Sequence, residues 1–432
     1  MAKIIICTGF VLFLLISFLG QATYPEIVWS NDFFGYIELG RNIFNKLSFV
    51  VHWQLDNPII YPPLFSILTH LLTLFTKNPL ISIQYLNAFS ASLCLIPLFL
   101  VTKKLLNNFS AFLVTIFMVY FLAQNRPCYF PYIEYFFTFL TLTVFWFIWD
   151  LLTRENKKAA SFIFLGILIS LAYLTKYHGI IYCLWAVILI FCFFRQGHYG
   201  LKVILKRISF LVLGFLPLFI TYHTLLHING RDEEAGDAGV FLFMDGIKGD
   251  REHQIYMLNP GGREFNYLSD CRSFTAFSFC SKYPELVQRR YVEGLKSTLR
   301  IMTRCVFPFK FAEKKYFYII TQFILLFLTM AAWLKDKYRL KIIVVSLFAS
   351  TALLIPLYLY QVSEKYLIPF MPFYFILWLL GINGLYNAFQ DNTKFVNLKR
   401  FARLLIIALT IILACNYSLI FYKSIRSSQS KA

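Results

Sequence analysis

Charged residues are scarce in this sequence, and acidic residues are the scarcer kind. Asp, Glu, Lys and Arg together make up 15% of the 432 residues, and 22 acidic residues stand against 41 basic ones. Soluble domains carry about 25% charged residues, so the composition argues against a soluble globular protein. The positive charge does not indicate nucleic-acid binding either, because no soluble-looking basic patch interleaves with aromatic residues.

Residue spacings typical of metal sites are also missing. The nine cysteines are scattered, without a Cys-x-x-Cys pair or a Cys/His pattern. The acids within 232–250 lack the spacing of an EF-hand loop. No protein-bound metal is therefore predicted, and the dependence of any activity on a divalent metal stays open. Whether Cys271 and Cys280 form a disulfide is open too, since that requires an oxidising compartment.

Long apolar runs fill most of the chain. Hydrophobic residues account for 59% of it and aromatic residues for 19%, and the mean hydropathy is +0.63. A helix needs about 20 apolar residues to cross a bilayer. The runs therefore predict an all-α polytopic membrane protein of about eleven transmembrane helices. The expected spans are 4–20, 80–102, 109–125, 135–152, 159–175, 179–194, 208–226, 316–334, 341–359, 366–385 and 403–422.

The positions of Lys and Arg between these runs predict the topology. Basic residues collect in cytoplasmic loops. If the N-terminus is cytoplasmic and segment 61–77 does not cross, all the basic loops fall on one side. This segment is short and has polar residues at helical spacing, which fits an interfacial helix or one lining a polar cavity. We therefore expect interfacial helices in the first outer loop, with 1–23 as an uncleaved anchor.

Three regions follow from this topology. Residues 1–226 form an N-terminal transmembrane module that includes the first outer loop, 21–79. Residues 227–315 form an outer segment, within which 284–302 is predicted to be a surface helix. Residues 316–432 supply the C-terminal transmembrane helices.

Ionisable groups near membrane depth are costly, at about 2.5–3.5 kcal/mol on insertion scales, and are candidates for function. Asp32 follows the first span and begins an amphipathic helix. It can serve as a helix cap, or as a general base at the membrane surface. Glu134 opens a span, with Arg126 as a candidate partner. It can be a solvated carboxylate at a helix start, or it can take part in chemistry.

Lys176 and His178 lie between two spans on the same outer face. Lys176 can extend its amine toward water, or it can bind a phosphate as a compact positive charge. Lys365 poses the same alternatives, and Glu364 beside it is a candidate partner.

Residues on the outer face occur in an order typical of one enzyme family. They are Asp32, Tyr36, Arg41-Asn42, Tyr61-Pro62-Pro63-Leu64, Glu134, Leu174-Thr175-Lys176 and Lys365-Tyr366-Leu367-Ile368-Pro369. This ordered set resembles the GT-C superfamily of membrane glycosyltransferases that use polyprenyl-phosphate sugars. The branch it resembles holds the protein O-mannosyltransferases and the lipid A aminoarabinose transferases.

The resemblance implies transfer of one sugar from a polyprenyl-monophosphate donor to a hydroxyl of a lipid, glycan or protein acceptor, with inversion. Asp32 would take the acceptor proton, and Glu134 would orient the acceptor or assist the base. The leaving phosphate needs positive charge. The implied candidates are Lys176 first, and then Arg126, His178 and Lys365. The prenyl tail would lie among the helices, next to membrane lipid.

The sequence departs from the family pattern at three places. Asn31 and Phe33 flank Asp32 where relatives often carry a second acid, which weakens a metal site at this loop. Lys365 replaces a common arginine and loses its two-pronged geometry. Residues 177–179 contain Tyr-His-Gly where a glycine often follows the lysine directly.

Other functions remain as alternatives. A transporter or lipid flippase often has two related halves with matching helix breaks, which this sequence lacks. A glycan ligase or polymerase would use a diphosphate donor, and a non-catalytic scaffold would use none. The outer loops contain no Asn-x-Ser/Thr site. This favours a bacterial inner membrane over the endoplasmic reticulum, with the active site on the outer face.

Overall fold

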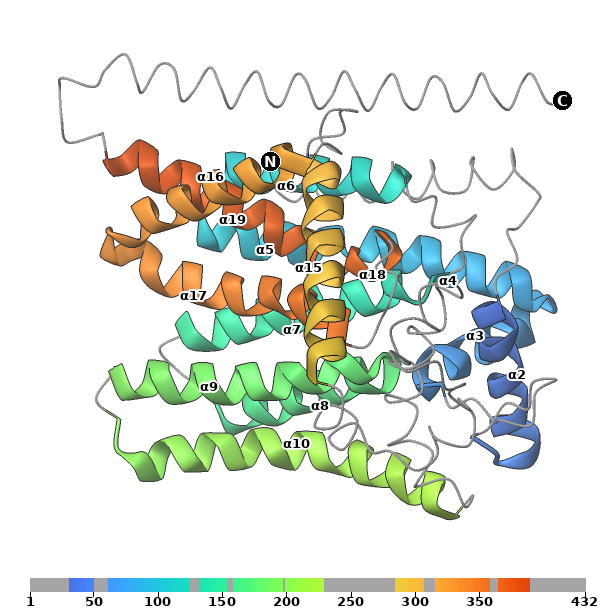
Figure 1. Cartoon of the computed structure of the whole chain (residues 1–432). Coiled ribbons are helices and arrows are strands. Elements are labelled where there is room, and N and C mark those ends of the chain that lie inside the picture. The colour runs from blue at the N-terminus through green and yellow to red at the C-terminus, as the bar shows by residue number, and fades with distance from the viewer. Residues whose placement is uncertain are drawn as a thin grey trace, which may run out of the picture.

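A computed structural model of the chain shows a helical protein (Figure 1). The structure describes residues 31–49, 61–124, 132–153, 158–196, 199–228, 284–306, 315–357 and 364–388. Within these ranges the elements are helices, and no β-strand occurs. The all-α fold expected from the sequence is confirmed.

The helices follow the apolar runs closely. In chain order they are α2 (Asn31–Lys46), α3 (Pro63–Thr76), α4 (Pro79–Leu93), α5 (Leu95–Leu105), α6 (Asn108–Gln124), α7 (Glu134–Thr153), α8 (Ala159–Thr175), η1 (Tyr177–Gly179), α9 (Ile180–Gln196), α10 (Leu201–Ile228), α15 (Pro284–Val306), α16 (Lys315–Trp333), α17 (Asp336–Ser350), η3 (Thr351–Leu357), α18 (Glu364–Leu367) and α19 (Met371–Ala388). The expected spans at 4–20 and 403–422 lie outside the described residues.

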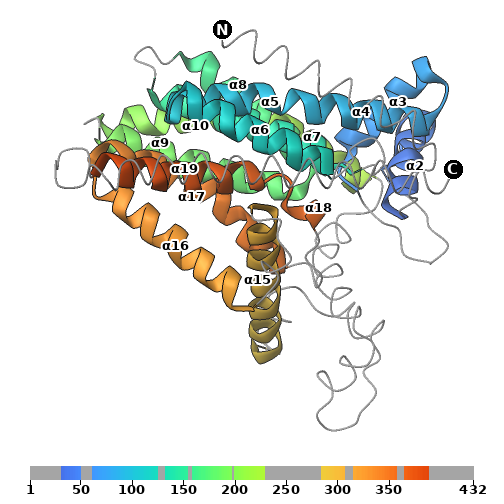
Figure 2. The same cartoon turned by 90° about the horizontal axis from the view of Figure 1, so that it is seen from above.

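Within the described ranges, five helical stretches are long and apolar enough to cross a membrane. They are Pro79–Leu105, Glu134–Thr153, Tyr177–Phe194, Leu201–Ile228 and Tyr316–Trp333. In the two orthogonal views most of the long helices run along one direction, while α16 tilts away from the others (Figures 1 and 2). Large apolar side chains on α10 and α16 are exposed, as expected for helices that face lipid. The chain is therefore a polytopic membrane protein.

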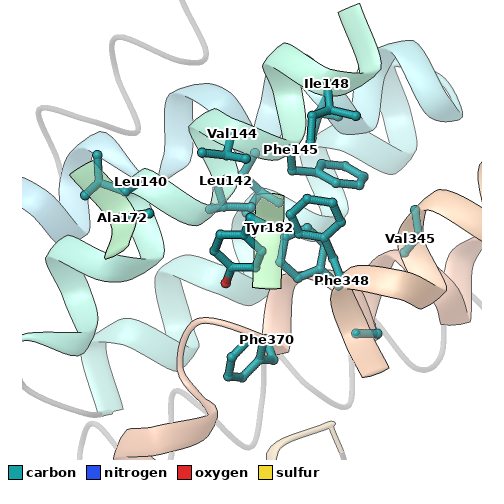
Figure 3. Packing of buried hydrophobic residues seen from close by; sticks show 14 of the residues in the cluster. Leu140, Leu142, Val144, Phe145, Ile148, Ala172, Tyr182, Val345, Phe348 and Phe370 are labelled. Atoms are coloured by element: carbon teal, nitrogen blue, oxygen red, sulfur yellow. The ribbon is translucent and has the colours of Figure 1, made fainter. Parts of the chain in front are cut away.

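An aromatic core joins the helices in the middle of the bundle (Figure 3). Tyr182 of α9 stacks on Phe348 of α17 at a centroid distance of 5.2 Å, and Phe145 of α7 meets Phe348 edge-on at 4.8 Å. The Tyr182 hydroxyl is completely buried and bonds the Thr141 hydroxyl at 2.9 Å. Because a buried tyrosine hydroxyl needs a hydrogen-bond partner, Thr141 allows Tyr182 to lie in this apolar core.

Helices α8 and α10 pack backbone against backbone at two glycines. A Cβ added at Gly166 would lie 2.1 Å from the backbone oxygen of Leu211, and one at Gly214 would lie 2.0 Å from that of Ile163. The two backbones therefore touch, and only glycine fits at the crossing. This contact fixes how α10 is aligned along α8.

Lysines from two of the predicted basic loops lie at one end of the bundle. Lys104, at the end of α5, forms an ion pair with the buried Asp150 near the end of α7. Lys341, near the start of α17, donates to the backbone oxygen of Leu105. The side of the membrane that this end faces stays a prediction.

Helices α2 and α3 lie at the opposite end, side by side in both views (Figures 1 and 2). On α3, Ser66 and Thr69 are buried, whereas Leu74 and Phe75 are 61% and 83% exposed. The polar stripe thus faces the protein and the apolar side faces outward. The helix predicted to be interfacial therefore turns its polar side toward the protein.

Helix α15 runs across the bundle direction in both views, beside η3, α16 and α18 (Figures 1 and 2). Its buried side includes Thr298, Met302 and Cys305, and its exposed side includes Lys296 and Arg300. The segment 284–302, predicted to be a surface helix, is therefore helical, with one buried and one exposed side.

Candidate functional site

A buried ion pair lies at the end of the bundle that also holds α2 and α3. Nζ of Lys176 donates to Oε1 of Glu134 at 2.8 Å, and their side chains are only 17% and 4% exposed. Glu134 begins α7, and Lys176 follows α8. The pair therefore gives each buried side chain a partner of opposite charge.

The backbone holds Lys176 in an extended conformation between two helices. Its φ and ψ are −147° and 133°; its N–H donates to Ala172 O at 2.9 Å, and its own carbonyl accepts from Gly179 N–H at 2.8 Å. A Cβ at Gly179 would lie 2.4 Å from the backbone of Ala172 and Tyr173. Only glycine allows the chain to turn back this tightly, so Gly179 supports the break that presents Lys176.

A second lysine approaches the same place from α18. Nζ of Lys365 lies 4.9 Å from the centroid of the Tyr366 ring and 5.5 Å from that of Tyr132. Nζ of Lys176 lies 5.1 Å from the centroid of the same Tyr366 ring. Both distances to Tyr366 are within the range of cation–π attraction. Two lysines that lie far apart in the sequence therefore both contact the Tyr366 ring.

The start of α7 is anchored on α4. The Asn87 side-chain amide, oriented with its nitrogen toward Tyr132 O (3.0 Å) and its oxygen toward Tyr132 N (3.1 Å), holds the residue two positions before Glu134. The Cys94 thiol donates to Tyr135 O at 3.6 Å, on the other side of Glu134. These contacts fix the backbone on both sides of the carboxylate.

Asp32 lies in the first turn of α2, and its side chain is outside the described part of the structure. One turn later Tyr36 packs on Tyr61 and Phe65, with ring centroids 4.9 and 5.4 Å apart. Tyr36, Phe65 and Ile133 belong to one buried cluster. The helix that carries Asp32 is thus packed against the residue before Glu134.

The remaining candidates are placed only in part. His178 lies in η1, two residues after Lys176, and both of its ring nitrogens are shielded from solvent. Arg126, Cys271 and Cys280 lie outside the described residues. Among the residues that the structure describes, no group of three or more His, Cys, Asp and Glu side chains could hold a metal ion.

Several side chains at the site were not predicted as site residues. Tyr132 and Tyr366 contact the lysines, and Tyr173, Tyr177 and His223 surround the break that holds Lys176. The tyrosines beside Glu134, Lys176 and Lys365 in the sequence were a usable signal. Aromatic rings often contact cations, so a tyrosine next to a charged residue near a membrane surface is a candidate for such a contact.

Solved structures share this fold. ArnT from Cupriavidus metallidurans, in a structure bound to undecaprenyl phosphate, matches with a TM-score of 0.51 and 13% identity. The match covers 87% of this chain and 60% of ArnT. The archaeal oligosaccharyltransferase AglB from Archaeoglobus fulgidus, in complex with an inhibitory peptide and a dolichol-phosphate, matches with a TM-score of 0.53 and 16% identity. That match covers 96% of this chain and 56% of AglB.

Sequence comparison found neither a matching family model nor a similar curated protein. At this level of identity the solved structures show the fold alone, and this chain shares it with ArnT and AglB. The resemblance expected from the sequence is therefore confirmed for the fold. The chain spans about three fifths of ArnT and just over half of AglB.

Proposed function

We propose that this protein is an integral-membrane glycosyltransferase that moves one sugar from a polyprenyl-monophosphate donor to an acceptor hydroxyl. The observation that carries the proposal is that the amines of Lys176 and Lys365 lie 5.1 and 4.9 Å from the centroid of the Tyr366 ring, with Glu134 paired to Lys176, on a fold shared with ArnT. Phosphate oxyanions bind where ammonium groups converge. Two lysines held partly out of water suit a leaving group that develops negative charge.

Lys176 and Lys365 take the donor phosphate in this proposal. As the bond between the anomeric carbon and the phosphate oxygen breaks, the electron pair goes to that oxygen. Nearby positive charge stabilises the oxyanion, and such stabilisation is strong in a site shielded from water. The remaining candidates that the resemblance implies, Arg126 and His178, are proposed as further phosphate contacts.

Asp32 is the proposed general base. Its carboxylate removes the proton from the acceptor hydroxyl while the acceptor oxygen forms a bond to the anomeric carbon, and the phosphate leaves from the opposite face. This sequence inverts the anomeric centre and leaves the proton on Asp32. The packing of Tyr36 and Phe65 near Ile133 supports the assignment, because it brings the Asp32 helix to the start of α7.

The contact between Glu134 and Lys176 suggests a role for this carboxylate. Its carboxylate accepts from Lys176 Nζ at 2.8 Å, so we propose that it holds the lysine in place. The roles implied by the family resemblance, orienting the acceptor or assisting the base, are compatible with a carboxylate at this position when the donor phosphate engages Lys176.

The solved structures support a lipid-linked donor. ArnT was solved with undecaprenyl phosphate, and AglB with a dolichol-phosphate. Both molecules combine a long prenyl chain with a phosphate headgroup, which fits lysines at the end of a membrane bundle. We propose a bacterial inner membrane as the location, with the site on the outer face.

The test is sugar transfer by the purified protein. Polyprenyl monophosphate and diphosphate sugars are supplied with lipid and peptide acceptors, and loss of donor is followed. Wild type should turn over a monophosphate donor. Asp32→Asn should lose at least about 100-fold in rate, as expected for removal of a general base, while Asp336→Asn, which changes an exposed acid near the opposite end, should not.

Three results would contradict the proposal. Equal rates for wild type and Asp32→Asn would remove Asp32 as the base. Turnover with diphosphate donors alone would favour a glycan ligase. Absence of turnover with every donor, together with no binding of polyprenyl phosphate, would favour a transporter or a scaffold.

A further inference from the structure

Near its end, α10 forms hydrogen bonds to one side chain before Lys176 and to one after it. The Tyr173 hydroxyl bonds Nε2 of His223 at 2.8 Å. The Tyr177 hydroxyl bonds the Tyr222 hydroxyl at 2.9 Å. Tyr173 precedes Lys176 on α8, and Tyr177 follows it in η1. Two neighbouring residues on one helix therefore fasten the two ends of the segment that presents the lysine.

The glycine crossing aligns these partners. Gly166 and Gly214 bring the two helix backbones into contact. Tyr173 lies about two turns beyond Gly166 on α8, and Tyr222 lies about two turns beyond Gly214 on α10. Helices locked at one point stay in register over the next two turns, so Tyr222 and His223 meet the residues around Lys176.

The contacts are close and well shielded. Tyr222 is 2% exposed, and its ring centroid lies 6.4 Å from that of Tyr173. The His223 ring stacks on the Tyr173 ring at a centroid distance of 6.1 Å. Phe49, just beyond α2, meets the Tyr222 ring edge-on at 6.1 Å. Tyr222 therefore touches the segment after the Asp32 helix as well as the Lys176 break.

We propose that Tyr222 and His223 are positioning residues for the donor phosphate, acting through Lys176. This inference rests on the proposed function, because it requires Lys176 to bind the phosphate. Lys176 leaves the helical conformation, so the backbone bonds that join it to Ala172 and Gly179 need a further restraint from outside the segment to fix its side chain. The two hydroxyl contacts with α10 supply that restraint, and they keep Nζ of Lys176 between Glu134 and Tyr366.

The experiment measures the affinity of the purified full-length protein for polyprenyl phosphate without a sugar. Tyr222→Phe removes one hydroxyl and keeps the ring. A buried hydrogen bond contributes enough for a loss of about 3- to 10-fold in affinity. Tyr177→Phe should give a similar loss, and the double variant should be no weaker than either single one, because both changes break the same bond.

His223 provides a rescue test. His223→Leu should weaken binding by a similar factor, whereas His223→Gln, which keeps a hydrogen-bonding nitrogen in reach of Tyr173, should retain most of the affinity. The matched control is Tyr182→Phe. It removes a buried tyrosine bond of the same length, 2.9 Å to Thr141, but in the aromatic core. It should lower the melting temperature and leave the affinity unchanged.

The outcomes separate the two proposals. If wild type does not bind polyprenyl phosphate, the proposed function fails, and the inference fails with it. If wild type binds but Tyr222→Phe and His223→Leu bind equally well, only the positioning role is wrong. If Tyr182→Phe loses as much affinity as Tyr222→Phe, the losses reflect general loosening of the bundle, and the inference is overturned.

Discussion

The Glu134 carboxylate lies 2.8 Å from the Lys176 amine, although 42 residues separate them, and both side chains are largely buried. Removing two charges from water is unfavourable, and their attraction offsets this only while both are present. Each residue therefore depends on the other. A phosphate that enters the site would offer Lys176 a second anionic partner.

Replacing Glu134 with glutamine should destabilise the empty protein. Breaking a buried pair by removing one partner costs about 3–5 kcal/mol, because Lys176 loses its counter-charge. Polyprenyl phosphate should restore much of that loss by supplying a new anion. The measurement is the melting temperature in detergent with and without the lipid, and the gain on adding lipid should be larger for Glu134→Gln than for wild type.

The control for this prediction is Glu293→Gln. That carboxylate also pairs with a lysine, Lys296 at 2.6 Å, but it is 66% exposed. Exposed pairs contribute little, so the melting temperature should stay the same. A Glu134→Gln protein as stable as wild type would show that the ion pair is not needed to keep Lys176 buried.

Much of the site follows from the order of spans along the sequence. Counting helices and charges predicted that Glu134, Lys176 and Lys365 share one face, and the structure brings all three together at one end of the bundle. Helix ends are readable because apolar runs have a defined length. Which charges pair with one another is a further step that the spacing of spans does not determine.

The partners of Tyr173 and Tyr177 were beyond sequence reasoning for a physical reason. Their bonds to His223 and Tyr222 depend on how far α10 is shifted along α8. That shift is set by a glycine contact, and a sequence does not reveal which glycines meet. The inward-facing polar side of α3 was one of two interpretations for a similar reason, because periodicity shows a stripe but not what it faces.

Gly214→Ala should loosen the α8–α10 contact and, with it, the Lys176 segment. The new methyl group would lie 2.0 Å from Ile163 O, so the helices must separate. Overpacking of this kind typically costs about 1–3 kcal/mol. Thermal unfolding should show a lower melting temperature, and affinity for polyprenyl phosphate should fall because Tyr222 moves away from Tyr177.

Gly200→Ala is the matched control for this change. Nothing lies within 4 Å of a Cβ at Gly200, so stability and affinity should both be preserved. If Gly214→Ala lowers stability but leaves phosphate affinity intact, the glycine crossing supports the bundle without setting the register of the site.

Lys104→Met should destabilise the protein more than Lys103→Met does. Both lysines end α5 and are exposed, but Lys104 pairs with Asp150, whose side chain is 6% exposed. Removing Lys104 takes a counter-charge from a buried carboxylate, which is the costly direction. The comparison is made by melting temperature, and the loss should be reversed by Lys104→Arg. Equal melting temperatures for the two methionine variants would show that Asp150 does not depend on Lys104.

The orientation predicted from the charges can be tested with two introduced cysteines. Gly200 precedes α10 at the basic end, and Lys46 ends α2 at the site end; a side chain at either position is exposed. A charged maleimide that does not cross membranes is added to spheroplasts, with wild type giving the background from native cysteines. Lys46→Cys should be labelled in intact spheroplasts, and Gly200→Cys only after lysis, because basic loops face the cytoplasm. The reverse pattern would place the Lys176 and Glu134 pair on the cytoplasmic face, and a donor would then have to be presented from the inside.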